Sequence, residues 1–273
     1  MLLGAALRWR DPRPEVFVSN RRWPQVRPGE GATALKRKKR PEWPCTLCPP
    51  VKGSQCGALL RGAVREERQS GPRQSSYSAV PGGVIYRRGA MTDGAFAVCQ
   101  GWALRFIQLS DGRRQNLAVL LPGDLCLTAL FQDSLQFSVE AVTELRITRF
   151  ARSDLKRKIR EDANMLEQFG KACAAEQRDS DERAVNLGRR SAEERVANLM
   201  LGLVNRMSRQ HFRPNHDYAF PLLQRHIADL TGLTPVHVSR VMTEFRHAGL
   251  MRLSRGLLTV ANLAELEHIA QLL

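Results

Sequence analysis

The segment Leu223–Leu250, LQRHIADLTGLTPVHVSRVMTEFRHAGL, has the pattern of two short helices joined by a tight turn. Gly232 supplies the backbone freedom that this turn requires, because glycine adopts positive φ without strain. Thr234 is a favoured N-cap, and Pro235 suits the first position of the second helix. Gly249 is placed to end that helix. The segment therefore predicts a helix-turn-helix.

The second predicted helix has an apolar side and an outward side at helical spacing. Its apolar side, which would pack against the rest of the domain, consists of Val238, Val241, Met242 and Phe245. Its outward positions near the N-terminal end are Val236, His237, Ser239, Arg240 and Thr243. Such positions enter the DNA major groove, where Arg240 could bond the O6 and N7 atoms of guanine. A helical hairpin that only packs or binds protein is the alternative.

The residues around this motif extend the prediction. A strand pair, LMRLSR and GLLTVA, follows the second helix and looks like the wing of a winged helix-turn-helix. Arginines in a DNA-binding domain commonly contact phosphates, which fix the protein on the duplex. The candidates for this role are Arg225, Arg252 and Arg255.

Composition agrees with a nucleic-acid partner. The chain has 273 residues, a formal net charge of +15 and a sequence pI near 10.4. This length suggests two domains. A hydrophobic content of 43% is that of a globular protein, not of a collagen-like or disordered chain. Residues 1–44 hold eleven Lys or Arg against four Asp or Glu, and we expect them to form a disordered basic tail.

The sequence gives no support to a membrane protein or an enzyme. No run approaches the roughly 18–20 apolar residues that span a bilayer. The first residues lack the pattern of a secretory signal, so we expect a cytoplasmic location and no membrane partner. Cysteines in that compartment are more often thiols or metal ligands than disulfides. A Walker loop, an HExxH helix and a GxSxG elbow are all absent, so we expect no catalytic activity.

The hydrophobic period changes along the chain and divides it into segments. Short apolar strands broken by Gly and Asp predict a compact antiparallel barrel or roll, and a helical period follows, with Ser153 as the expected N-cap. Ser191-Ala-Glu-Glu194 is a capping box that marks a new domain. The expected segments are the tail 1–44, a Cys-rich segment 45–78, a β-roll sensor domain 79–160, a dimerisation helix 161–188 and a winged helix-turn-helix domain 189–273.

The long helix predicted after the roll has apolar ends and an acidic middle. Apolar residues at spacings of four and three share one face near its beginning. The apolar face weakens from Gln177 to Glu182, which is unusual for a buried core but reasonable for a subunit contact of adjustable strength. The expected dimer seam consists of Met165, Phe169, Ala172, Asp179 and Asp181.

The chain resembles bacterial transcription regulators of the Crp/Fnr family from about Cys45 to its C-terminus. The matching pieces, in order, are VIYRRGA, GWALRF…LSDGRRQ…LLPGDL, GRRSAEERVANLML and GLTPVHVSRVMTEFRHAGL. The resemblance implies an α+β fold with an N-terminal cyclic-nucleotide-binding-like β-roll of eight strands, a long dimerisation helix and a C-terminal winged helix-turn-helix. It also implies a homodimer that reads an inverted repeat in double-stranded DNA, with RNA polymerase as a further partner.

Two stretches depart from family patterns. Fnr-type recognition helices usually carry Glu-x-x-Ser-Arg, whereas Val236 stands here where the glutamate would read a base. Valine can pack on a thymine methyl group but cannot accept a hydrogen bond from cytosine. The stretch 123–141 lacks the Gly-Glu and Arg-Ser pairs that hold cAMP in relatives, and it contains no Lys or Arg. We therefore expect no binding of cAMP.

Three cysteines at the beginning of the Cys-rich segment have the spacing of metal ligands. Cys45, Cys48 and Cys56 form C-x2-C-x7-C, which lets thiolates share one metal centre. The pattern resembles the N-terminal cysteines with which Fnr-type oxygen sensors hold a [4Fe–4S] cluster. The position of the family's fourth ligand is near Leu145, which cannot bind iron. Cys126 is the preferred substitute.

The remaining cysteines and the histidines limit which metal or cofactor sites the sensor half could form. Cys99 is the alternative fourth ligand, and Cys173 on the long helix is expected to be a packing residue. All six histidines follow residue 210, so the sensor half has no His for a zinc or haem site. We expect a DNA-binding regulator that responds to oxygen or redox state through a cluster. The alternatives are a FixK-like regulator of the same fold without a cluster, and a zinc or thiol redox regulator.

Overall fold

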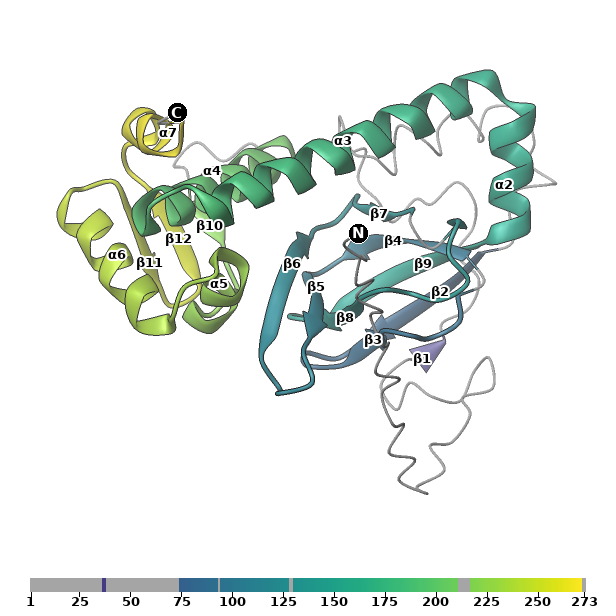
Figure 1. Ribbon diagram of the computed structural model, residues 1–273, viewed down its shortest axis with the longest axis horizontal. Helices are drawn as coiled ribbons and strands as arrows, with labels where there is room; N and C mark the ends of the chain where they lie inside the picture. The colour runs from purple at the N-terminus through teal and green to yellow at the C-terminus, as the bar shows by residue number, and fades with distance from the viewer. Residues whose placement is uncertain (1–35, 38–73, 93, 128–129, 211–216, 272–273) are drawn as a thin grey trace, which may run out of the picture. The chain divides into compact units, whose positions relative to one another are not determined.

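Figure 1 shows the computed structural model of the chain, which describes residues 36–37, 74–92, 94–127, 130–210 and 217–271. The N-terminal part of this structure is the predicted antiparallel roll, built from two sheets. One sheet has the order β1 (Lys36–Arg37), β2 (Gln74–Ala79), β9 (Leu145–Ala151), β4 (Gly94–Gln100) and β7 (Leu125–Cys126). The other has the order β3 (Val84–Tyr86), β8 (Ser138–Ala141), β5 (Ala103–Gln108) and β6 (Arg114–Leu120).

The first long strand of the roll begins ahead of the expected segment boundary at residue 79. Gln74 pairs with Phe150 and Ala79 with Leu145, so all of β2 runs antiparallel to β9. Its sequence, QSSYSA, is mostly polar, so the strand lacks the apolar pattern from which the other strands of the roll can be predicted. The roll therefore includes residues that we had placed in the Cys-rich segment.

The inside of the roll is filled by side chains from both sheets. Phe96, Leu120, Leu135 and Ile147 belong to one buried cluster there. The pairing of β4 with β9 begins at Gly94, where a Cβ atom would lie 1.9 Å from the backbone oxygen of Phe150. Only glycine fits this close approach.

Two helices follow the roll with a sharp change of direction between them. The first is α2 (Arg152–Glu161) and the second is the long helix α3 (Ala163–Gly188) (Figure 1). The Asp162 carboxylate accepts hydrogen bonds from the Asn164 and Met165 amides, and so caps α3. Our expectation that Ser153 caps the helix after the roll is wrong. Ala151 holds that position and makes no side-chain cap.

The C-terminal part is the predicted winged helix-turn-helix. Its helices are α4 (Ala192–Gln210), α5 (Gln224–Thr231), α6 (Pro235–His247) and α7 (Leu263–Gln271). Its sheet has the order β10 (Asp217–Ala219), β12 (Leu257–Val260) and β11 (Met251–Ser254). The predicted capping box is confirmed, because the Ser191 and Glu194 side chains each bond the other's backbone amide. None of the helices described is both long and apolar enough to cross a membrane.

Candidate DNA-binding surface and sensor residues

The turn between α5 and α6 has the geometry that the sequence predicts. Gly232 adopts φ +66° in the left-handed region, and a Cβ there would lie 3.0 Å from the Leu187 side chain. The Thr234 hydroxyl accepts a hydrogen bond from the His237 amide at 3.3 Å. Pro235 occupies the first position of α6. These local preferences fix where the second helix begins.

One face of α6 is buried and the opposite face is open. The buried residues are those expected from the sequence, namely Val238, Val241, Met242 and Phe245. On the other face Val236 is 76% exposed. His237, Arg240 and Thr243 are also exposed, and Ser239 is half-buried. The residues chosen from the sequence as the DNA-reading set therefore do lie on one accessible surface.

Arg240 is held only loosely in the absence of a partner. Its Nε lies 3.6 Å from a carboxylate oxygen of Glu244, and both side chains are largely exposed. Exposed ion pairs of this kind contribute little to stability. The guanidinium can therefore leave Glu244 for another acceptor at small cost.

The three arginines suggested as phosphate ligands are all exposed. Arg225 lies in the first turn of α5, and Arg252 lies in β11. Arg255 stands at the tip of the wing with φ +50°, next to Gly256 with φ +75°. The tight turn between β11 and β12 thus projects an arginine beyond the sheet.

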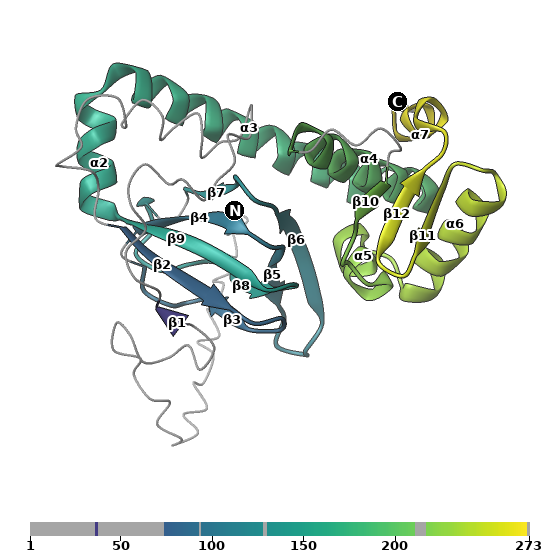
Figure 2. The same cartoon turned by 180° about the vertical axis from the view of Figure 1, so that it is seen from behind.

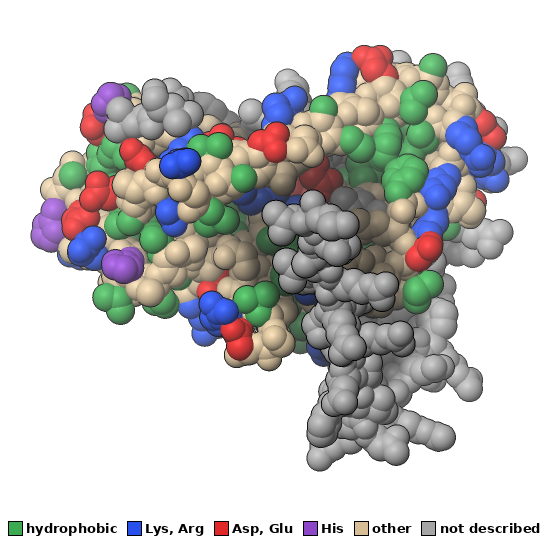
Figure 3. All heavy atoms as spheres, in the orientation of Figure 1, with side chains coloured by type: hydrophobic (Ala, Val, Ile, Leu, Met, Phe, Trp, Pro, Cys, Tyr) green, Lys and Arg blue, Asp and Glu red, His purple; other side chains and the backbone are tan. Residues whose placement is uncertain are grey.

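In Figure 3, the histidine side chains that are visible lie over the C-terminal part of the chain, as expected from their positions after residue 210.

The long helix α3 presents a different face from the one expected as a dimer seam. Met165 and Ala172 are buried against the roll of their own chain, in a cluster with Leu127 and Leu130. Phe169 packs on the same cluster, and its ring centre lies 5.4 Å from that of Phe131. The apolar face near the beginning of α3 is therefore occupied within one chain.

The neighbouring face of α3, one residue further round the helix, is open along most of its length. Its exposed residues follow spacings of four and three, and they are Leu166, Gly170, Cys173, Gln177, Ser180 and Ala184. We call these residues the exposed stripe. Cys173, expected to be a packing residue of the long helix, is on this stripe, and partial burial raises the pKa of its thiol. Asp181 lies beside the stripe and accepts a hydrogen bond from Gln177, whereas Asp179 lines a cavity on the other side.

That cavity, of about 560 Å³, lies between the roll, α3 and α4. Arg105 of β5 reaches across it to Glu176 of α3 at 2.6 Å, and Arg206 of α4 pairs with Asp124. Burial raises the pKa of Asp124, and the nearby Arg206 opposes this shift. Arg105 and Arg206 thus already have carboxylate partners in the chain itself, and so are not held ready for a phosphate.

The candidate cluster ligands fall into two groups. Cys45, Cys48 and Cys56 lie outside the described residues. Cys126 is 6% exposed and belongs to the buried cluster inside the roll, and Cys99 is equally buried, with its sulfur 3.2 Å from the Thr148 hydroxyl. In the part of the chain that the structure describes, no three Cys, His, Asp or Glu side chains form a metal site. Neither Cys126 nor Cys99 is presented as a ligand in this arrangement.

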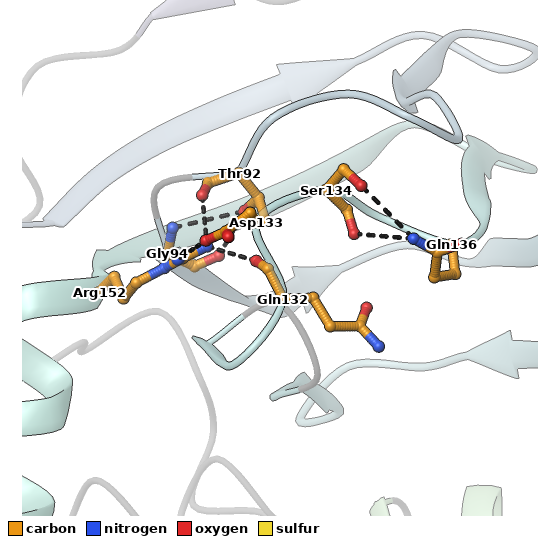
Figure 4. Close-up of polar contacts among 7 residues, drawn as sticks. All are labelled: Thr92, Gly94, Gln132, Asp133, Ser134, Gln136 and Arg152. Atoms are coloured by element: carbon orange, nitrogen blue, oxygen red, sulfur yellow. Dashed lines mark hydrogen bonds and ion pairs between the residues drawn. The ribbon is translucent and has the colours of Figure 1, made fainter.

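The loop after Cys126 is attached to the start of α2 through Arg152, a residue that sequence reasoning missed. Arg152 donates to the backbone oxygens of Thr92, at 2.6 Å, and of Gln132, and it pairs with Asp133 at 3.0 Å (Figure 4). One arginine therefore joins three segments that are distant in sequence. Nothing in its local pattern distinguishes it from an ordinary charge beside a helix.

Comparison with known proteins agrees with this architecture. Residues 78–162 match the cyclic nucleotide-binding domain family, and residues 194–269 match the Crp-like helix-turn-helix domain family. The chain is 30% identical over 226 residues to a "Probable transcriptional activator" of Rhizobium leguminosarum bv. viciae, which spans 82% of this chain and 92% of that protein. The chain belongs to the Crp/Fnr family of transcription regulators. Members of this family regulate transcription and are not enzymes.

Further similarities lie within the same family. The "Nitrogen fixation regulation protein FixK" of Bradyrhizobium diazoefficiens is 28% identical over 226 residues, covering 83% of this chain and 93% of that protein. The solved structure of FixK2 from Bradyrhizobium japonicum is similar with a TM-score of 0.65 at 27% identity, covering 72% of this chain and 97% of that one. This Crp/Fnr chain is thus a DNA-binding transcription regulator with the α+β fold expected.

Proposed function

We propose that this Crp/Fnr regulator binds an inverted DNA repeat as a homodimer and changes its DNA affinity in response to oxygen or redox state through its N-terminal cysteines. The observation that carries the DNA-reading part is the open face of α6. Val236 and Arg240 lie one helical turn apart on that face, both exposed.

The chemistry of that face indicates what it reads. Arg240 can donate two hydrogen bonds to guanine, and Val236 can pack on a thymine methyl group at a neighbouring base pair. Ser239 and Thr243 can bond a base edge or a phosphate, and His237 can contact the backbone. Arg225, Arg252 and Arg255 supply charge for phosphates on either side. A half-site that contains guanine and thymine close together is therefore expected.

A binding assay tests this part directly. Duplexes selected from a random pool by the full-length protein should contain an inverted repeat, and the affinity should fall steeply with salt. Arg240→Ala should weaken binding by about 1–3 kcal/mol and relax the preference for guanine. Arg246→Ala, on the C-terminal end of the same helix, is the matched control and should leave the preference unchanged. Salt-insensitive binding or no selected repeat would contradict the proposal.

The exposed stripe of α3 is the surface that we assign to the second subunit. Its spacing of four and three is that of a two-helix coiled coil. Its small and polar members would make this contact weak, which suits a dimer that a signal strengthens or loosens. Light scattering at several protein concentrations measures this equilibrium, and Gly170→Leu should shift it toward the dimer. A concentration-independent monomer would count against the assignment.

The sensor part rests on Cys45, Cys48 and Cys56. Their spacing fits a metal–thiolate centre, which would supply iron–sulfur redox chemistry if a cluster is bound. Cys126 and Cys99 do not fit as the fourth ligand, because either thiol would have to leave the roll. If Cys45, Cys48 and Cys56 hold the cluster, iron and acid-labile sulfide should accompany anaerobically purified protein, and Cys48→Ser should abolish both. Cys126→Ala and Cys99→Ala should retain them.

A cluster-free regulator of the same fold is the second candidate. The burial of Cys126 and Cys99 favours it, since four exposed thiols are then not available among the candidate residues. Absence of iron under strict anaerobiosis, together with intact DNA binding, would support this candidate. DNA binding that changes with a thiol oxidant and depends on Cys45 or Cys56 would then indicate thiol-based regulation.

A further inference from the structure

The C-terminal part packs on one edge of the roll. Figures 1 and 2 both show α5 beside β6. The ring of Trp102, which precedes β5, meets that of Phe220 edge-on, with centres 5.8 Å apart. Leu104 and Val119 of the roll belong to the same buried cluster as Ile227 of α5. The two parts of the chain therefore share one apolar core along this edge.

Polar contacts surround this shared core. Arg206 of α4 donates to the backbone oxygen of Val119 at 3.0 Å and pairs with the Asp124 carboxylate. The side-chain amide of Gln115, on β6, donates to the backbone oxygen of Asp229 in α5. These contacts connect two helices of the C-terminal part to adjacent points of the roll.

The point to which Arg206 attaches lies next to the interior of the sensor. Asp124 also accepts the Leu121 amide at 2.8 Å, and its backbone oxygen accepts the amide of Val98 in β4 at 3.0 Å. Leu125 and Cys126, the two residues of β7, follow it directly. A displacement of β7 would therefore move the carboxylate that holds α4.

The helix α6 takes no part in these contacts with the roll, but its orientation depends on the helices α4 and α5, which make them. It packs on α5 across the Gly232 turn, and its DNA-reading face remains open. A change in how α4 and α5 sit on the roll would therefore change the direction of α6. In a dimer, this direction sets the distance between two recognition helices, which must match successive major grooves.

We propose that Arg206 and Gln115 are positioning residues that fix the helix-turn-helix on the β5–β6 edge of the roll and transmit the state of β7 to α6. The effect on DNA affinity rests on the proposed DNA-binding function, whereas the contact itself does not. Removing these polar contacts should change the orientation of the helix-turn-helix and not its folding, because the apolar core remains.

Hydrogen exchange on the full-length protein tests the contact without DNA. Arg206→Gln should speed amide exchange in residues 114–120 and 224–231 about tenfold, which corresponds to ~1.4 kcal/mol. Residues 145–151 of β9, a strand that does not pair with β7, should be unchanged. Arg206→Lys retains a charge for Asp124 and should recover much of the protection. Arg113→Gln is the control, since Arg113 lies on the same β5–β6 hairpin but pairs only with exposed Asp111 among the described residues.

A double-mutant cycle on DNA affinity tests the transmission. Arg206→Gln and Asp124→Asn should each change affinity several-fold, and the double variant should do little more than either one. Additive effects, or unchanged exchange in residues 224–231, would overturn the proposal. If the wild type binds no DNA, the proposed function fails, and the exchange experiment still decides whether the contact exists.

Discussion

The Thr234 hydroxyl accepts the His237 backbone amide at 3.3 Å and so caps the first turn of α6, the second helix of the helix-turn-helix. The same hydroxyl lies 3.2 Å from Nδ1 of the His237 ring. The threonine therefore orders both the backbone and one of the outward side chains at the N-terminal end of α6.

Thr234→Ala should destabilise the protein by about 1 kcal/mol, because it leaves a first-turn amide without its cap. Thr234→Ser keeps the hydroxyl and should remain near the wild type. Chemical denaturation followed by circular dichroism measures both. Equal stability of the alanine and serine variants would show that the cap contributes nothing.

Asp181→Asn should strengthen the dimer by about twofold to fivefold, since it removes like charges beside the exposed stripe. Asp179→Asn is the matched control. Asp179 lies on the cavity side of α3, where its charge acts on Arg183, and it should leave the dimer constant unchanged. Sedimentation equilibrium of the two variants gives the comparison. A stronger effect at position 179 would mean that the subunits meet on another face.

His226 should make the helix-turn-helix sensitive to mild acid. Partial burial lowers its pKa below the ordinary value, and the charges of Arg225 and Arg114 add to this effect while Glu140 opposes it. Its Nδ1 also accepts the Leu223 amide at 3.2 Å, which requires the unprotonated ring. A lowered pKa means that the stability gained from neutral His226 is complete above about pH 6.5. It is then lost as the pH falls through the lowered pKa.

The measurement is the free energy of unfolding between pH 5 and pH 8. His226→Gln should flatten its dependence on pH below neutrality, because glutamine does not titrate. His247→Gln, at the exposed end of α6, serves as the control. A pH profile that is the same for the wild type and His226→Gln would rule out this role.

Gly94→Ala should be among the most damaging single methyl additions in the chain. The added carbon would meet the Phe150 oxygen at 1.9 Å, so β4 and β9 would have to separate locally. A loss of about 3 kcal/mol or more is expected. Gly202→Ala, in α4 with open space around the position, should instead hold or raise the melting temperature. Thermal unfolding of the two variants provides the test.

The helix-turn-helix could be predicted from sequence because its signals are local. Gly232, Thr234 and Pro235 each impose a backbone conformation that depends on a few neighbours only. The face of α3 could not be predicted in the same way. Met165 and Ala172 make an apolar face that suits either a partner subunit or the chain's own roll, and only the tertiary packing distinguishes the two.

Residues that look alike in the sequence also differ in how deeply the fold buries them. Cys126 and Cys173 are both single cysteines in regular elements, yet one lies inside the roll and the other lies on an open helix face. Arg152 could not be identified at all, because its acceptors come from segments brought together by the fold. Such long-range contacts leave no periodic signal.

The edge-on contact of Trp102 with Phe220 has a consequence for how the molecule comes apart. The domain boundary expected from the sequence lies near residue 189. The buried apolar core is continuous across that boundary, because residues of the roll and of the C-terminal part belong to the same cluster. Freed from the roll, the C-terminal part would expose the ring of Phe220 and the apolar side of α5 to water. The roll and the winged helix-turn-helix should therefore melt in one cooperative transition, which calorimetry of the full-length chain would show as a single peak.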